Sequence, residues 1–332
     1  MARTGKLKRN GKRLEFQEKL LAWYDVHARD LPWRKDRDPY RVWVSEIMLQ
    51  QTRVAAVLSH YREFLRRFPS VRKLAVAKES AVLAAWSGLG YYRRARMMHA
   101  AAKKIVRERK GRFPQNSEEW RELPGIGRYT AAAIASIAFG EPIAVVDGNV
   151  ERVLQRFAGR PLPAREIWLA AEDLLDRKRP GDFNQALMEL GATVCSPRTP
   201  ACLVCPVATL CVSRGELPLR LEASRQVRRT INYALDCHQG KIFLIQRPAH
   251  ANLMAGMWEL PEIHLTQTAA KPAFKLRHSI TVTDYAVRIW KEPAPTHLKG
   301  NWIPLKRLHS LPLTGLARKT LSMAGLLSKP QN

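Results

Sequence analysis

The sequence predicts two domains of different fold class: an all-α region over residues 14–212 and a small α+β domain over residues 231–332. Three observations support this prediction. Apolar residues recur at helical spacing up to residue 212, four cysteines close that region, and runs typical of β-strands begin at Ile231. A chain of 332 residues is long enough for two ordinary hydrophobic cores.

The first region contains segments whose apolar residues have the spacing of amphipathic helices. They are Leu14–Tyr24, Val42–Leu65, Ala81–Trp86, Arg96–Val106, Thr130–Phe139 and Ile167–Leu175. Proline- or glycine-containing breaks separate them, at residues 68–70, 87–90, 140–142 and 179–181. Asn116 and Glu119 are spaced as a capping box, so a further helix is expected to begin there.

The N-terminal residues 1–13 hold six basic residues and no acidic one. Because they lack an apolar core, we expect a disordered basic arm rather than a secretory signal. No apolar run approaches the ~20 residues that span a bilayer. We therefore expect a cytoplasmic protein that has no membrane partner.

The C-terminal domain is predicted from a change of pattern. Residues 213–230 are polar, basic and without a clear period, which indicates a linker. Strands are expected at residues 231–235, 241–245 and 279–290, with a hairpin turn over 236–240 between the first two, and a closing helix is expected within 311–327.

A metal site is predicted from Cys195, Cys202, Cys205 and Cys211, spaced C-x6-C-x2-C-x5-C. Thiolates are strong metal ligands, and four from one loop can complete a site. Two disulfides are the less favoured alternative, because a chain without a secretory signal stays reduced. Zinc is the main rival, but the unequal gaps favour an iron–sulfur cluster. Cys237 stands alone and is expected to be a small buried residue.

The net charge of +27 indicates a polyanionic partner. The excess is +19 before residue 231 and +8 after it, so both domains are basic. Lysines and arginines that neutralise phosphates release condensed counterions, which favours nucleic-acid binding. A basic protein with another task remains the alternative.

A glycine-rich turn, Leu123-Pro124-Gly125-Ile126-Gly127, precedes the helix that begins at Arg128. Such a turn between helices lets backbone N–H groups approach a phosphate, and the following helix N-terminus adds a positive dipole. This is the helix-hairpin-helix way of holding a DNA backbone. An ordinary helix–helix turn is the alternative.

Two acidic residues are candidates for chemistry. Asp147 follows the apolar run 143–146 and is expected to cap the helix that starts near Val150, which leaves it free to face a cleft as well. Glu46 lies in an otherwise apolar and amide-rich segment between Trp43 and Ile47. At the edge of a buried face its pKa is expected to rise, which suits acid catalysis.

These features together resemble the helix-hairpin-helix DNA glycosylases that carry a 4Fe–4S cluster, and within them the MutY-type adenine DNA glycosylases. The matching strings are Leu31-Pro32-Trp33-Arg34, Ser45-Glu46-Ile47-Met48-Leu49-Gln50-Gln51-Thr52, Gly88-Leu89-Gly90-Tyr91-Tyr92, Leu123-Pro124-Gly125-Ile126-Gly127, Val146-Asp147-Gly148-Asn149-Val150 and the four cysteines. The resemblance covers residues 14–212 closely and extends to the C-terminal domain.

The resemblance implies removal of adenine mispaired with 8-oxoguanine or guanine from duplex DNA. Glu46 is implied as the acid that protonates the base, and Asp147 as the carboxylate that stabilises the sugar cation. Relatives with lyase activity have a lysine where this chain has Tyr129, so a monofunctional, hydrolytic enzyme is implied, with Tyr129 supporting the Asp147 side of the pocket. A monomer that carries one 4Fe–4S cluster and associates with a bacterial-type nucleoid is expected.

Further site residues follow from the same resemblance. Contacts to DNA are implied for Leu49, Gln51, Tyr91, Gly125, Gly127 and Arg128, and contacts to the extruded base for Arg29, Trp33, Arg34 and Gln185. Helix packing and surface charge are the alternative roles of the second group.

The segment Leu253–Pro261 resembles the glycine–aromatic part of a Nudix-like domain. The downstream acidic run that holds Mg²⁺ in Nudix hydrolases is missing from residues 262–300, so a recognition module is implied rather than a second enzyme. Known relatives read 8-oxoguanine with a Phe-Ser-His trio. Here Ile280, Thr281 and Val282 take that position, with His278 close by.

The main alternative is an endonuclease III-like glycosylase that acts on oxidised pyrimidines, which Tyr129 and the added C-terminal domain disfavour. A non-catalytic DNA-binding iron–sulfur sensor leaves Glu46 and Asp147 without a role. A zinc-stabilised structural protein is the third alternative.

Overall fold

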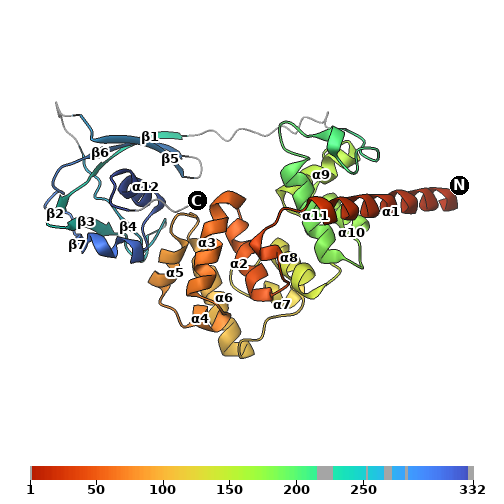
Figure 1. Ribbon diagram of the computed structural model, residues 1–332, viewed down its shortest axis with the longest axis horizontal. Helices are drawn as coiled ribbons and strands as arrows, with labels where there is room; N and C mark the ends of the chain where they lie inside the picture. The colour runs from red at the N-terminus through yellow and green to blue at the C-terminus, as the bar shows by residue number, and fades with distance from the viewer. Residues whose placement is uncertain (1, 215–226, 252, 265–270, 281–282, 328–332) are drawn as a thin grey trace. The chain divides into compact units, whose positions relative to one another are not determined.

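The computed structural model describes residues 2–214, 227–251, 253–264, 271–280 and 283–327 (Figure 1). The chain divides into two compact units. The first contains residues 1–50 and 107–221, and the second contains residues 51–106 and 222–332. No helix in the described ranges is long and apolar enough to cross a membrane.

The first unit is helical. Its elements are α1 (Ala2–His27), the 3₁₀ turn η1 (Pro32–Arg34), α2 (Pro39–Leu49), α7 (Ser117–Arg121), α8 (Arg128–Phe139), α9 (Gly148–Ala158), α10 (Ala164–Leu174), α11 (Pro180–Thr193) and the 3₁₀ turn η2 (Cys202–Val204). Helix α6 (Arg93–Arg109) crosses the boundary between the units. The all-α prediction for this part is confirmed.

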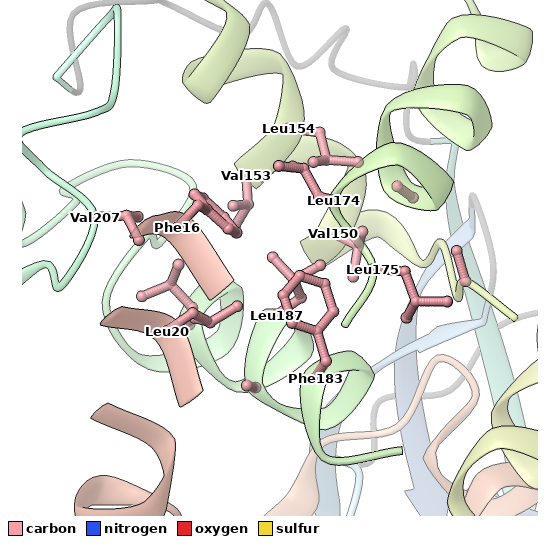
Figure 2. Close-up of a cluster of buried hydrophobic side chains, with 14 of the residues drawn as sticks. Phe16, Leu20, Val150, Val153, Leu154, Leu174, Leu175, Phe183, Leu187 and Val207 are labelled. Carbon is pink, nitrogen blue, oxygen red and sulfur yellow. The ribbon is translucent and has the colours of Figure 1, made fainter. Parts of the chain in front are cut away.

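One apolar core joins α1, α9, α10, α11 and the cysteine loop (Figure 2). Phe16, Leu154 and Phe183 are among its almost fully buried side chains, and Val207 brings the cysteine loop into the same cluster. Gly191 lets α11 approach the start of α9, because a Cβ there would lie 2.6 Å from the Cβ of Asn149. The core thus fixes α9 and the cysteine loop in one rigid body.

Two expectations for the N-terminal part are wrong. Residues 2–13 belong to α1 instead of a disordered arm, since lysine, arginine and leucine favour helix and no proline interrupts them. The segment Val42–Leu65 is two helices, because α2 ends at Leu49 and α3 begins at Val54. Gln51 between them has a φ of +53°, which no continuous helix allows.

The second unit combines helices with two small sheets. Its helices are α3 (Val54–Arg67), α4 (Val71–Ala75), α5 (Glu79–Trp86) and α12 (Gly315–Met323), with the 3₁₀ helix η3 (Leu305–Ser310). Its strands are β1 (Val227–Ala234), β2 (Cys237–His238), β3 (Lys241–Gln246), β4 (Trp258–Glu259), β5 (Phe274–Ile280), β6 (Thr283–Trp290) and β7 (Asn301–Pro304). The α+β prediction for residues 231–332 is confirmed, since the strands, α12 and η3 fall there, while α3, α4 and α5 belong to the part predicted as helical.

The strand pairing differs from the expected hairpin. Strand β1 pairs in parallel with β6, and β6 pairs antiparallel with β5. Strand β3 pairs with β2, β4 and β7, so the turn near Gly240 joins β2 to β3 instead of β1 to β3. The single strand expected over 279–290 is the end of β5 and all of β6.

The expected linker over 213–230 is only partly within the described residues, since 215–226 lie outside them. Residues 227–230 already belong to β1. The expected closing helix within 311–327 is α12. Cys237 is exposed, contrary to the expectation of burial, because β2 is a short edge strand.

Candidate active site

Glu46 is a buried acid of the first unit. It lies near the end of α2 and is only 6% exposed. Burial, which penalises the charged carboxylate, raises the pKa of Glu46 to about 7. A hydrogen bond from Tyr129 and the charge of Arg34 act in the opposite direction, and the negative charge of Asp147 adds to the rise. At neutral pH this carboxyl group can both give and take a proton.

Tyr129 bonds directly to this acid. Its hydroxyl donates to Glu46 Oε2 at 2.9 Å, from the first turn of α8. The expectation placed Tyr129 on the side of Asp147, but the hydrogen bond goes to Glu46. Burial, followed by the charges of Glu46 and Asp147, holds the Tyr129 pKa well above its usual value. The three groups therefore act on one another electrostatically, although about 100 residues separate Glu46 from Asp147.

Asp147 caps α9 as the sequence predicts. Its Oδ1 accepts the backbone N–H groups of Asn149 at 2.9 Å and Val150 at 2.7 Å. Its Oδ2 accepts from the side chain of Asn149 at 2.8 Å. These bonds fix the half-buried carboxylate at the positive end of the helix.

A chain of polar contacts runs from this carboxylate to the cysteine loop. Asn149 Oδ1 accepts a hydrogen bond from Arg152 Nη2 at 2.9 Å, and Arg152 Nε donates to the carbonyl oxygen of Cys195 at 2.8 Å. Arg152 also donates to the carbonyl oxygen of Gly191 at 2.7 Å. The position of Asp147 is thereby tied to the loop that carries the four thiols.

Helix α11 supplies two buried polar residues that sequence reasoning missed. Asn184 donates to Ser136 Oγ at 3.0 Å and to the Ile143 carbonyl at 2.9 Å, and accepts from Val145 N at 3.2 Å. It thus holds the extended segment that leads to Asp147. The clue lay in Pro180, which we treated as a break but which begins α11 at its first turn.

Glu189 is the second of these residues and is 1% exposed. Its carboxylate accepts from Arg29 Nε at 2.6 Å and from Arg34 Nη2 at 2.8 Å. The two arginines expected to contact an extruded base therefore neutralise a buried acid. Their hydrogen bonds outweigh the burial of Glu189 and lower its pKa to about 2.

The four cysteines line one small cavity. All four side chains are partly buried, and no three of the His, Cys, Asp and Glu side chains in the described residues are arranged to hold a single metal ion. Arg156, 3% exposed, donates to Cys195 Sγ at 3.3 Å and to the carbonyls of Ser196 and Pro197 at 2.7 and 2.9 Å. The buried guanidinium of Arg156 therefore holds the first residues of the cysteine loop in place.

The glycine-rich turn connects α7 to α8 as predicted. Gly125 has a φ of +76°, and both Gly125 and Gly127 are exposed, while Ile126 between them is buried. A Cβ on Gly127 would meet nothing within 4 Å, so the space beside its Cα is open. Arg128 is exposed as well, but its guanidinium stacks on the Trp168 ring at 3.6 Å.

The remaining expected contacts vary in exposure. Trp33 is buried and packs in the first unit, whereas Gln185 and Leu49 are half-buried. Tyr91, in the second unit, is 47% exposed with a φ of +46°. Gln51 is exposed and also has a positive φ.

The expected 8-oxoguanine readers are incompletely described. Thr281 and Val282 lie outside the described residues, and only the backbone of Ile280 is placed, at the end of β5. His278 lies in β5 opposite Tyr285 of β6. Burial and the charge of Lys319 lower the His278 pKa, so its imidazole is neutral at physiological pH.

The chain is similar to known DNA repair proteins. The HhH-GPD superfamily base excision DNA repair protein family matches residues 44–167. The chain is 37% identical to the adenine DNA glycosylase of Homo sapiens, over 86% of this chain and 63% of that protein. It is 34% identical to the adenine DNA glycosylase of Schizosaccharomyces pombe, over 86% of this chain and 68% of that protein.

Solved structures give the same fold. A thermostable thymine-DNA glycosylase is similar at a TM-score of 0.59 and 32% identity, covering 63% of this chain and 99% of that one. The chain spans just under two thirds of the human relative's length.

Proposed function

This chain belongs to the adenine DNA glycosylase family, and on that premise we propose that it hydrolyses the N-glycosidic bond of adenine mispaired with 8-oxoguanine or guanine in duplex DNA. The observation that carries the proposal is the pairing of a protonatable Glu46 with the capped carboxylate of Asp147. Two carboxyl groups in different environments are what acid-assisted glycosidic cleavage requires.

Glu46 acts as the acid on an adenine that has been extruded from the base stack. Its carboxyl group gives a proton to N7 of the base. The C1′–N9 bond then breaks, and its electron pair leaves with the neutral adenine. The pKa of about 7 makes the protonated form abundant enough for this step near neutral pH.

Asp147 faces the positive charge that develops on the sugar. Its carboxylate is held by three hydrogen bonds from Asn149 and Val150, so it stabilises the oxocarbenium ion without moving. Because the carboxylate is already oriented, it does not have to rearrange when the positive charge develops on the sugar.

Hydrolysis needs a base for the attacking water. Glu46, now a carboxylate, takes the proton as the water oxygen bonds to C1′, and the hydrogen bond from Tyr129 steadies the anion. No amine stands at position 129 to form a Schiff base with the sugar, which supports a monofunctional reaction that leaves an intact abasic site.

DNA binding rests on charge and on exposed backbone. The chain carries a net charge of +27, and the exposed glycines Gly125 and Gly127 precede the N-terminus of α8, which suits a phosphate. Leu49, Gln51 and the exposed Tyr91 enter the disturbed duplex. Trp33 and Gln185 flank the base, whereas Arg29 and Arg34 act by neutralising Glu189.

Cys195, Cys202, Cys205 and Cys211 hold one 4Fe–4S cluster. The proposal is supported by the four thiols, which line one shared cavity, since an iron–sulfur cluster is held by four cysteine thiolates. The cluster supplies a rigid cross-link of the loop. Arg152 and Asn149 connect this loop to Asp147 by hydrogen bonds, so a rigid loop restrains the position of Asp147.

The C-terminal domain is a Nudix-like recognition module for the base opposite adenine. His278, neutral and half-buried, and the segment that follows β5 are its candidate readers. The protein acts as a monomer on mispaired duplex DNA in the cytoplasm.

The test is a single-turnover assay on a duplex panel, with and without alkali. Adenine opposite 8-oxoguanine is expected to be released, with strand breaks only after alkali. Thymine opposite guanine is included because of the similar thymine-DNA glycosylase, and thymine glycol tests an endonuclease III-like activity. Release of thymine or thymine glycol in place of adenine would overturn the proposal.

The cluster has its own readout. A brown protein whose visible absorption disappears with the iron, with about four irons per chain, is expected from four thiolate ligands. A colourless protein that contains one zinc contradicts this part of the proposal without affecting the assignment of Glu46.

A further inference from the structure

The turn that presents Tyr91 is anchored within the second unit by a small set of polar residues. Ser87 ends α5, and its hydroxyl donates to the carbonyl oxygen of Leu313 at 2.7 Å. The Tyr92 hydroxyl donates to the same carbonyl at 3.1 Å. Arg318 Nε in turn donates to Ser87 Oγ at 2.9 Å. These contacts among Ser87, Tyr92, Leu313 and Arg318 are called the Ser87 network below.

The network is buried and nearly saturated. Ser87 is 3% exposed and Tyr92 is 5% exposed. One carbonyl oxygen accepts two hydrogen bonds, and the Ser87 hydroxyl both donates and accepts, which uses most of its capacity. Removing the partner of a polar group buried in this way lowers the stability of the folded state, so each member of the network restrains the others.

Leu313 is a fixed anchor for this network. It is fully buried in the core of the C-terminal domain and pairs with Trp258 of β4. The next residue, Thr314, caps α12 because its Oγ1 accepts a hydrogen bond from Ala317 N at 3.2 Å. The carbonyl that receives Ser87 and Tyr92 therefore moves only with the C-terminal core.

The turn between Ser87 and Tyr92 has an unusual backbone conformation. Gly88 has a φ of +114°, and a Cβ there would lie 3.0 Å from His60 Nε2. Tyr91 itself has a φ of +46°, a conformation that costs free energy for a residue with a side chain. The network holds this strained turn and leaves the ring of Tyr91 47% exposed.

We propose that Arg318, acting through Ser87 and Tyr92, is a positioning residue by which the C-terminal domain sets the conformation of Tyr91 for DNA. This inference rests on the proposed contact of Tyr91 with the disturbed duplex. It assigns to α12 a role in the reaction that does not require α12 to touch DNA. The C-terminal domain then has two roles. It favours one conformation of the turn between Ser87 and Tyr92, and it recognises the base opposite adenine.

The experiment is a double-mutant cycle on the full chain, with Tyr91→Ala, Arg318→Ala and the double variant. The readout is the dissociation constant for a duplex with adenine opposite 8-oxoguanine, together with the fluorescence of 2-aminopurine placed beside the mispair. Arg318→Ala is expected to weaken binding about fivefold and to lower the unstacking signal, and both effects should vanish in the Tyr91→Ala background.

Equal weakening by Arg318→Ala in both backgrounds would overturn the inference, because Arg318 would then act without Tyr91. Arg307→Ala, at an exposed arginine of η3, is the control for lost positive charge and should change neither readout. A similar loss from Arg307→Ala would show that charge alone matters, which also overturns the inference.

Tyr92→Phe keeps the ring and removes the hydroxyl that donates to the Leu313 carbonyl and accepts from Gly88 N, so it serves if Arg318→Ala does not fold. A loss of about twofold that disappears with Tyr91→Ala is expected. No loss, or an equal loss in both backgrounds, contradicts the inference. Adenine release by the wild type is measured separately, so an inactive protein that still shows the coupling would overturn only the proposed function.

Discussion

The helical region and the C-terminal domain bury very different side chains. Residues 14–214 hide charged and amide groups, among them Glu46, Arg156, Asn184 and Glu189. Within the described part of residues 227–327, the buried polar side chains are only Thr314 and Thr320. Burying a charge lowers the free energy of unfolding unless the charge is paired. The polar interior of residues 14–214 therefore reduces the stability of that region. The difference teaches that polar groups are built into the interior of the helical region and are nearly absent from the interior of the described C-terminal domain.

The largest expected effect tests whether the polar interior serves catalysis. Glu46→Gln keeps the shape and the hydrogen bond from Tyr129 but cannot give a proton. Adenine release in single turnover is expected to fall by about 10²–10⁴-fold, with duplex binding retained. Glu166→Gln, at an exposed glutamate of α10, is the matched control. A wild-type rate in Glu46→Gln would show that this acid is structural.

The second prediction tests the cost of a broken buried pair. Glu189→Ala leaves Arg29 and Arg34 without their carboxylate, and we expect the free energy of unfolding to fall by about 3–5 kcal/mol. Glu166→Ala removes the partner of Arg160 at an exposed ion pair and should cost less than about 1 kcal/mol. Chemical denaturation measures both, and equal losses would remove the distinction between buried and exposed pairs.

The third prediction uses the raised pKa of Glu46. Folding is linked to protonation of this group between its ordinary pKa of 4.5 and the folded value of about 7, so its contribution is present below pH 4.5 and is lost as pH rises through 7. Glutamine does not titrate. The stability of Glu46→Gln relative to wild type should therefore increase by about 3 kcal/mol from pH 4.5 to pH 8, at about 1.4 kcal/mol for each pKa unit.

Denaturation curves across that pH range measure the third prediction. A constant difference between Glu46→Gln and wild type would mean that Glu46 titrates alike in the folded and unfolded chain. The burial seen in α2 would then have no electrostatic consequence.

The smallest expected effect concerns the C-terminal domain. Thr314→Ala removes the N-cap of α12 and should lower the free energy of unfolding by about 1 kcal/mol. Thermal unfolding measures it, with Thr314→Ser as the control that keeps the cap. A loss as large as that of Glu189→Ala would show that the few polar groups of this domain matter as much as those of the helical region.

The sequence predicted much of the site because its strongest signals are local. A cap such as Asp147 acts within three residues, and a glycine at a positive φ such as Gly125 is required by its own turn. The segment from Pro180 onward was harder, since this proline is compatible both with a break and with the first residue of α11. Missing that helix meant missing Asn184 and Glu189.

The sequence by itself determined the two fold classes, the cysteine spacing, the absence of a lysine at Tyr129 and the two acids. These depend on residue type and short-range periodicity. Only the tertiary structure decided that Tyr129 bonds to Glu46, that Glu189 occupies Arg29 and Arg34, and that Leu313 anchors Ser87. Each of these contacts joins residues more than 80 positions apart, and a hydrogen bond over that separation exists only after the cores have packed.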